Sequence, residues 1–365
     1  MRSMLQLNEG WFFLKEHPEN LRSVPIDAKS VCLPHTWNGI DGQDGGNDYF
    51  RGTCCYAKKI QRSELPAGQR YFLEINGANS SADVYLNGVH LAHHDGGYSA
   101  WRVDLTEALQ NENLLVIMVD NAPNETVYPQ HADFSFYGGL YRSVNIIAVP
   151  ETHFELLQYG HPGIHVTPAI EGQNAKVHID APAVNLQPGD QIRYRIVDDE
   201  GDVVAEQIGC RVFWIENVHL WDGKKDPYLY TAEAAILRGD TELDTVTTQF
   251  GCRSFVFDPE RGFILNGREY PLHGVCRHQD RWQIGNALLP EHHREDMDLI
   301  CELGANTIRL AHYQHDQYFY DLCDERGMIV WAEIPYISRH MSTGNENTVQ
   351  QMQELIIQCY NHPSI

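Results

Sequence analysis

The chain has 365 residues, enough for two or three domains, and 42% of them are hydrophobic, an ordinary fraction for soluble cores. Its formal net charge of -23 argues against nucleic acid or an anionic membrane surface as a partner, because both require basic surface. No run of about 18 apolar residues occurs, so no membrane-spanning helix is expected.

The nine cysteines show neither metal-ligand spacing nor a disulfide framework. An odd count of this kind predicts free, mostly buried thiols and a reducing compartment. The first nine residues contain no apolar signal-peptide core, although a signal peptide that had been removed would leave the same start. We therefore expect a cytoplasmic protein.

Residues 1–149 consist of short segments with alternating apolar and polar side chains, which is typical of strands. Asn87-Gly88 between two of them is a strong hairpin signal. A long irregular stretch, 121–139, has the length of a functional loop. We expect a jelly-roll sandwich with strands at 71–75, 82–86 and 114–119.

Residues 150–254 alternate in the same way, for example at 175–179 and 191–197, with an acidic turn at 198–202. About a hundred residues with this rhythm suit an immunoglobulin-like β-sandwich. The Cys-Trp-Cys core of true immunoglobulin domains is absent, so the prediction is of architecture only.

Residues 255–365 change to strands alternating with helices, the pattern of βα units around a parallel sheet. They read as three of the eight units of a (β/α)8 TIM barrel, so the fold prediction is a multidomain chain that ends within a truncated barrel. With the opposing strands missing, we expect the inner barrel face to be unpartnered and to carry Val275, Ile308, Leu310 and Val330.

Polar side chains follow the predicted barrel strands, where chemistry gathers in this fold. His278 follows the first strand, Arg309 and His312 lie at the end of the second, and Glu333 ends the third. A structural hydrogen bond would explain either histidine by itself. Four polar residues that all lie at strand ends favour a functional site. Glu333 could be a catalytic acid, but a glycosidase needs two carboxyl groups and Glu333 supplies only one.

His292, His293 and Glu295 resemble a metal cluster only by composition. They fall in the first turns of a predicted helix, at its solvated end, so we expect no metal there.

A series of short motifs, in order along the whole chain, resembles glycoside hydrolase family 2, which contains β-galactosidases, β-glucuronidases and β-mannosidases. Each motif is weak by itself, and the ordered set is specific. The motifs are Leu33-Pro34-His35-Thr36-Trp37, Tyr137-Gly138-Gly139-Leu140-Tyr141-Arg142, Leu220-Trp221-Asp222-Gly223 with Pro227-Tyr228-Leu229-Tyr230, Phe250-Gly251-Cys252-Arg253, Gly274-Val275-Cys276-Arg277-His278, Ile308-Arg309-Leu310-Ala311-His312-Tyr313 and Asn361-His362-Pro363-Ser364-Ile365.

The resemblance implies roles for site residues. Asp133, in the long loop of the sugar-binding jelly roll, matches an aspartate that binds sugar hydroxyls in the family. His278 and His312 match substrate-contacting histidines. Arg309 matches the arginine that pairs with the nucleophilic glutamate, and Glu333 supports the same site.

Both catalytic glutamates of the family lie beyond the position of Ile365, so no catalytic residue is assigned within this chain, and we expect it to be inactive alone. Metal-dependent β-galactosidases of the family carry an E-x-H pair where this chain has Ile337 and Arg339. The resemblance therefore implies no metal and no cofactor.

These observations predict part of a retaining β-glycosidase, most similar to β-galactosidases, acting on terminal β-D-galactosides in carbohydrate metabolism. A β-glucuronidase or another family 2 enzyme stays open, as does a non-catalytic carbohydrate-binding protein. The expected partner is a carbohydrate, with neither nucleic acid nor membrane, and a homo-oligomer is compatible with the sequence.

Overall fold

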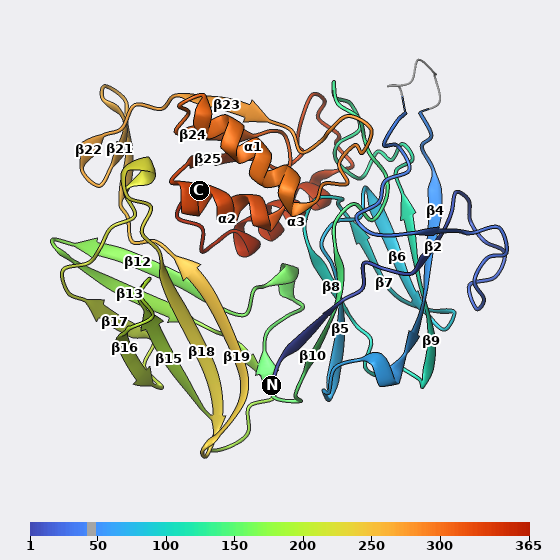
Figure 1. Cartoon of the computed structure of the whole chain (residues 1–365), viewed down its shortest axis with the longest axis horizontal. Helices are drawn as coiled ribbons and strands as arrows, with labels where there is room; N and C mark the ends of the chain where they lie inside the picture. Colours follow the sequence, from blue (N-terminus) through green and yellow to red (C-terminus); the bar gives the residue numbers. More distant parts are fainter. Residues whose placement is uncertain (42–48) are drawn as a thin grey trace.

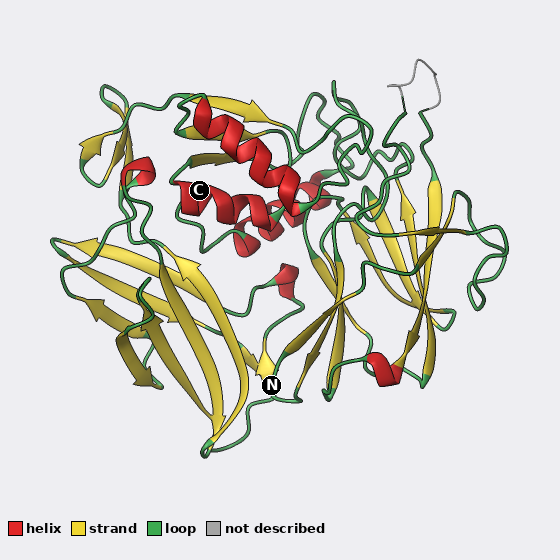
Figure 2. Cartoon of the chain, viewed as in Figure 1, coloured by secondary structure: helices red, strands yellow, loops and turns green. Residues whose placement is uncertain are grey.

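The computed structural model describes residues 1–41 and 49–365. Two antiparallel β-sandwiches flank a unit of three parallel strands and three helices, which lies above and between them in the view of Figure 1. Figure 2 shows that the long helices are confined to this last unit. The predicted fold class, a jelly roll, an immunoglobulin-like sandwich and the beginning of a TIM barrel, is confirmed.

The first sandwich consists of two antiparallel sheets with the strand orders β1-β10-β5-β8 and β3-β2-β4-β9-β6-β7. Its elements are β1 (Ser3–Gln6), β2 (Trp11–Leu14), β3 (Lys29–Val31), β4 (Thr53–Gln61), the 3-10 turn η1 (Arg62–Glu64), β5 (Arg70–Ile75), β6 (Ser81–Leu86), β7 (Val89–Asp95), β8 (Trp101–Asp104), β9 (Glu112–Asp120) and β10 (Val144–Val149).

Alternation along the strands places the core between these two sheets. Ala82, Val84 and Leu86 of β6 are buried in it, and the residues between them face outward. Asn87 and Gly88 both have positive φ angles, 55° and 79°, as a two-residue hairpin turn requires, and they join β6 to β7 as predicted.

The second sandwich pairs a sheet of order β12-β13-β17 with one of order β16-β15-β18-β19 around its own buried core. Its elements are β11 (His153–Phe154), η2 (Gln158–Gly160), β12 (His165–Glu171), β13 (Asn174–Asp180), β14 (Ala183–Val184), β15 (Gln191–Val197), β16 (Val203–Ile208), β17 (Val212–Ile215), η3 (Gly223–Lys225), β18 (Tyr230–Arg238) and β19 (Thr241–Phe250).

A small antiparallel sheet leads into the parallel unit, whose strand order is β23-β24-β25. Each parallel strand is followed by a helix that packs back on the sheet. The elements are β20 (Phe255–Asp258), β21 (Gly262–Leu265), β22 (Arg268–Glu269), β23 (Gly274–Arg277), α1 (Pro290–Glu302), β24 (Thr307–Leu310), α2 (Gln317–Arg326), β25 (Ile329–Ala332) and α3 (Asn345–Gln358).

The expected orientation of the parallel strands was wrong. Ile308, Leu310 and Val330 are buried under the helices, in a cluster with side chains of α1, α2 and α3, and Val275 packs against the same cluster. The face without helices carries Arg309 and, in register on the neighbouring strands, Cys276 and Trp331. Because side chains alternate in a strand, moving the apolar set to the helical side turns Arg309 toward the barrel interior.

Helix α3 joins the barrel unit to the first sandwich. Gln358 exchanges two hydrogen bonds with the backbone of Ala100, at 3.1 and 2.8 Å, and His94 Nε2 lies 2.7 Å from Glu354 Oε1. The following Asn361 accepts from Val166 N at 2.8 Å and thereby reaches the second sandwich. The three parts of the chain are thus held together by buried polar contacts.

All nine cysteines are free, and five of them are buried, as predicted. None of the helices in residues 1–41 and 49–365 is long and apolar enough to cross a lipid bilayer.

We expect Leu310→Ala to destabilise the barrel unit by about 2–5 kcal/mol, because it removes a fully buried side chain from the helical side of the sheet. Leu303→Ala, at a residue that is 74% exposed, should cost no more than about 0.5 kcal/mol. Urea unfolding followed by circular dichroism measures both. Equal, small effects would mean that Leu310 faces the open side.

Candidate active site

The candidate site lies at the carboxyl ends of the three parallel strands. His278 follows β23, His312 follows β24, and Glu333 follows β25, while Arg309 projects from β24 itself. Parallel strands in register place their carboxyl ends at one edge, so residues more than fifty positions apart in the chain meet there.

Arg309 and Glu333 form the best-defined contact of the site. Arg309 Nε donates to Glu333 Oε1 at 2.5 Å, and Nη2 lies 3.2 Å from Oε2 of the same carboxylate. This two-pronged geometry is the strong form of an arginine–carboxylate pair, and it raises the pKa of Arg309. The remaining guanidinium nitrogen, Nη1, contacts only the weak acceptor Cys276 Sγ, at 3.8 Å.

His312 is held by the same pair. Its Nδ1 lies 3.0 Å from Glu333 Oε2 and 2.9 Å from Arg309 Nη2. Since Nδ1 is engaged on this side, Nε2 is the ring atom left for a ligand. Glu333 therefore orients both a cation and an imidazole, which is a positioning task.

An aromatic side chain brings the first sandwich over this edge. The Phe134 ring lies 5.1 Å from the ring of His278 and 5.9 Å from that of His312, centroid to centroid. Asp133, the adjacent residue, is exposed and contributes an attractive charge at His278. The long loop thus reaches the two histidines, and the structure brings together all five residues that the sequence nominated.

Two effects set the protonation of His278. Burial comes first and lowers its pKa, and the positive charges of His312 and Arg309 add to it, against the opposing charges of Asp280 and Asp133. The His278 Nδ1 also lies 3.1 Å from the hydroxyl of Tyr313. A neutral imidazole fixed in this way can donate or accept one hydrogen bond at a sugar hydroxyl.

Arg142 of the first sandwich supports the loops that carry both histidines. Its side chain is buried, and its guanidinium donates to Gln279 Oε1 at 2.9 Å and to the Gln314 carbonyl at 3.0 Å. A further bond of 2.6 Å reaches the Tyr98 carbonyl. Gln279 follows His278 directly, and Gln314 lies two residues after His312, so one cation anchors both loops.

Sequence reasoning missed Phe134 and Tyr313 as parts of the site. Tyr313 stacks on Tyr98 of the first sandwich, with centroids 4.2 Å apart and planes at 8°. Both missed residues stand beside nominated ones, Phe134 after Asp133 and Tyr313 after His312. Adjacency to a functional residue was the available signal, but an aromatic neighbour is also common in any core.

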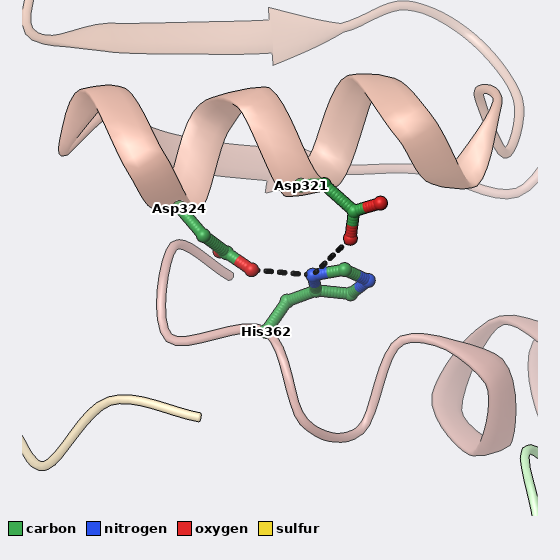
Figure 3. Close-up of side chains that lie close together, drawn as sticks. All are labelled: Asp321, Asp324 and His362. Atoms are coloured by element: carbon green, nitrogen blue, oxygen red, sulfur yellow. Dashed lines mark hydrogen bonds and ion pairs between the residues drawn. The ribbon is translucent and has the colours of Figure 1, made fainter. Parts of the chain in front are cut away.

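Asp321, Asp324 and His362 form the one group among the described residues whose potential ligand atoms all lie within 4.8 Å of one another (Figure 3). His362 Nδ1 lies 2.6 Å from Asp324 Oδ2 and 4.0 Å from Asp321 Oδ1. Burial opposes the charged imidazole, yet the two carboxylates outweigh it and raise the pKa of His362. The group is an ion pair that fastens the turn after α3 to α2.

The three residues that resembled a metal cluster have separate structural partners. His292 Nδ1 accepts the backbone N–H of Leu289 at 3.0 Å, at the start of α1. His293 Nδ1 lies 3.1 Å from Arg277 Nη2, and Glu295 pairs with Arg281 at 2.6 Å.

Three models of one family match successive parts of the chain. The glycosyl hydrolase 2 galactose-binding domain-like model matches residues 49–147, the glycosyl hydrolases family 2 model matches 162–253, and the family 2 TIM barrel domain model matches 259–365.

Individual relatives agree with these models. A β-glucuronidase of Bacteroides fragilis is 36% identical over the whole chain, which covers 55% of that protein, and a β-galactosidase of Thermoanaerobacterium thermosulfurigenes is 27% identical with 53% of its length covered. The crystal structure of an FMN-binding β-glucuronidase from Facaelibacterium prausnitzii L2-6 superposes with a TM-score of 0.94 at 42% identity, covering all of this chain and 57% of that one. The chain thus spans about half the length of the relatives it matches.

We expect the pKa of His278 to lie below 6.5 and to fall further in Asp133→Asn, which removes an attractive charge. Asp240→Asn, in the exposed turn between β18 and β19, should leave it unchanged. NMR titration of the histidine resonances measures the pKa of His278 in the unmodified chain and in both variants. Because the folded-state pKa is depressed, this ring opposes folding as the pH falls below about 6.5. If the pKa of His278 is the same in Asp133→Asn as in the unmodified chain, the Asp133 carboxylate does not act on this ring.

Proposed function

The chain belongs to glycosyl hydrolase family 2, and from this membership we propose that it forms the N-terminal part of a retaining β-glucuronidase. The observation that carries the proposal is the ranking of relatives: 36% and 42% identity to β-glucuronidases, against 34% to a Bacteroides fragilis structure named as a putative β-galactosidase and 27% to the β-galactosidase of Thermoanaerobacterium thermosulfurigenes. The comparisons do not support the galactoside preference expected from the sequence, and the β-glucuronidase alternative fits them better.

In this proposal the described residues bind and orient the sugar. The Asp133 carboxylate accepts hydrogen bonds from sugar hydroxyls, and the free ring nitrogen of His312 makes a further one. The neutral ring of His278 adds a donor or acceptor beside them. Phe134 and Tyr313 keep the two imidazoles in place.

Arg309 has a separate task. Its Nε and Nη2 are fixed by Glu333, which leaves Nη1 facing the barrel interior with only a thiol contact. A guanidinium at that point stabilises the ionised form of a nucleophilic carboxylate, as the family resemblance implies. The pair of carboxylates that retention requires, about 5 Å apart, would come from barrel strands beyond those described.

A protein that carries the complete barrel should hydrolyse an aryl β-D-glucuronide with kcat/KM at least about 100-fold above that for the matching β-D-galactoside, because a site built to pair a charged group rejects the neutral analogue. The 365-residue chain by itself should turn over neither substrate. A preference for the galactoside would overturn the assignment, and activity of the short chain would show that its carboxylates suffice.

In the same complete protein, Asp133→Ala should lower kcat/KM by about tenfold or more, since a charge-assisted hydrogen bond is worth about 1.5–3 kcal/mol. Asp240→Ala, remote from the site, serves as the matched loss of a carboxylate. Steady-state kinetics on one aryl glucuronide compare the two variants. A near-normal kcat/KM for Asp133→Ala would remove this residue from the site.

A further inference from the structure

A polar cavity of about 550 Å³ lies between the first sandwich and the loop that follows β25. Residues 123–125 and 130–131 form one wall, and residues 339–343 form the other. Thr343 Oγ1 donates to the Glu125 carbonyl at 2.6 Å, and Met341 N donates to Tyr128 Oη, also at 2.6 Å. These bonds hold the walls in place without a ligand.

The described lining of this cavity is basic, whereas the chain as a whole is acidic. Arg51 and Arg339 both line it, and neither has an acidic partner within ion-pair distance among the described residues. Glu125 is the single carboxylate among the described lining residues. Most arginines of the described part are ion-paired, and the net charge of the chain is -23, so two guanidinium groups that line one cavity without a described acidic partner favour an anion there.

Arg51 is held in a fixed orientation at this cavity. Its Nε donates to the Asn121 carbonyl at 2.7 Å, and its guanidinium lies 4.9 Å from the centroid of the Phe136 ring, so the group is fixed in orientation. Its Nη2 is buried and has no hydrogen-bond partner. Because Nη2 is out of contact with water, Arg51 acts on the cavity through the charge of its guanidinium rather than through a hydrogen bond from Nη2.

Arg339 approaches from the opposite wall. Its Nη1 lies 3.5 Å from Nε2 of His131, which brings the guanidinium across the gap toward the first sandwich. His340 uses Nδ1 on the Tyr336 hydroxyl at 3.0 Å, and its other nitrogen is left for a ligand. Planar guanidinium groups match the geometry of carboxylate and sulfate oxygens.

We propose that this cavity is an oxyanion-binding site for a carboxylate or sulfate carried by the part of the substrate beyond the cleaved sugar. Both walls are joined to the candidate site along the chain: His131 lies two residues before Asp133, and Arg339 lies six residues after Glu333. The assignment of the anion to a substrate rests on the proposed function; the binding of an oxyanion does not.

Calorimetric titration of this chain with sodium sulfate, at constant ionic strength set with sodium chloride, tests the site directly. We expect saturable binding that weakens about tenfold in Arg339→Gln, which loses a charge-assisted contact from an exposed side chain. Arg326→Gln removes the same charge from an exposed ion pair with Asp298 on the helical side and should bind sulfate normally. Absent saturation, or equal losses in both variants, would overturn the proposal.

A second titration identifies the source of the anion. A disaccharide bearing a sulfate or a uronic acid carboxylate should bind more tightly than its neutral counterpart, and Arg339→Gln should abolish the difference. Sulfate binding with no preference between the disaccharides would reject the substrate assignment. Neither titration involves turnover, so a failure here is distinct from a failure of the complete protein to hydrolyse a glucuronide with a neutral aglycone.

Discussion

The burial of one guanidinium group, that of Arg142, is the constraint on which the candidate site depends. An arginine removed from water is tolerated only when its donors are satisfied, and here carbonyl and amide oxygens of both the first sandwich and the barrel unit satisfy them. Asp316, with an oxygen 3.5 Å from Nε, supplies the counter-charge. Withdrawing either part would strand the charge, so the sandwich and the strand ends behave as one body.

Precision at the site follows from this arrangement. His278 and His312 stand on loops, which are ordinarily the mobile parts of a fold. Here Arg142 donates hydrogen bonds to both loops, the Phe134 ring packs near both imidazoles, and Tyr98 stacks on Tyr313. The first sandwich has a separate core, yet its residue Phe134 lies near both imidazoles, which explains how the adjacent Asp133 can take part from another domain.

Much of this could be predicted from the sequence, because strand and helix periods, turn residues and ordered motifs are local signals. The five site residues could be predicted because four of them lie at the carboxyl ends of predicted parallel strands and the fifth lies in one long loop. The side of the sheet that Ile308 and Leu310 occupy could not be predicted: alternation shows that Arg309 faces opposite to them, but not which face is covered. The sugar preference could not be predicted either, since the motifs around His312 are common to several activities. No local sequence pattern links Arg51 with Arg339, which are 288 positions apart.

The turn that follows α3 bears on how the chain is made. Asn361 binds the second sandwich at Val166 and Ile164, His362 pairs with α2, and the Ser364 carbonyl accepts from Val330. Synthesis runs from the N-terminus, and at about 5–20 residues per second the first sandwich is complete roughly 10–40 s before these residues emerge from the ribosome. Each sandwich therefore folds around its own core first, and residues synthesised after both of them add to the direct Arg2–Asp244 ion pair in fixing the orientation of one relative to the other.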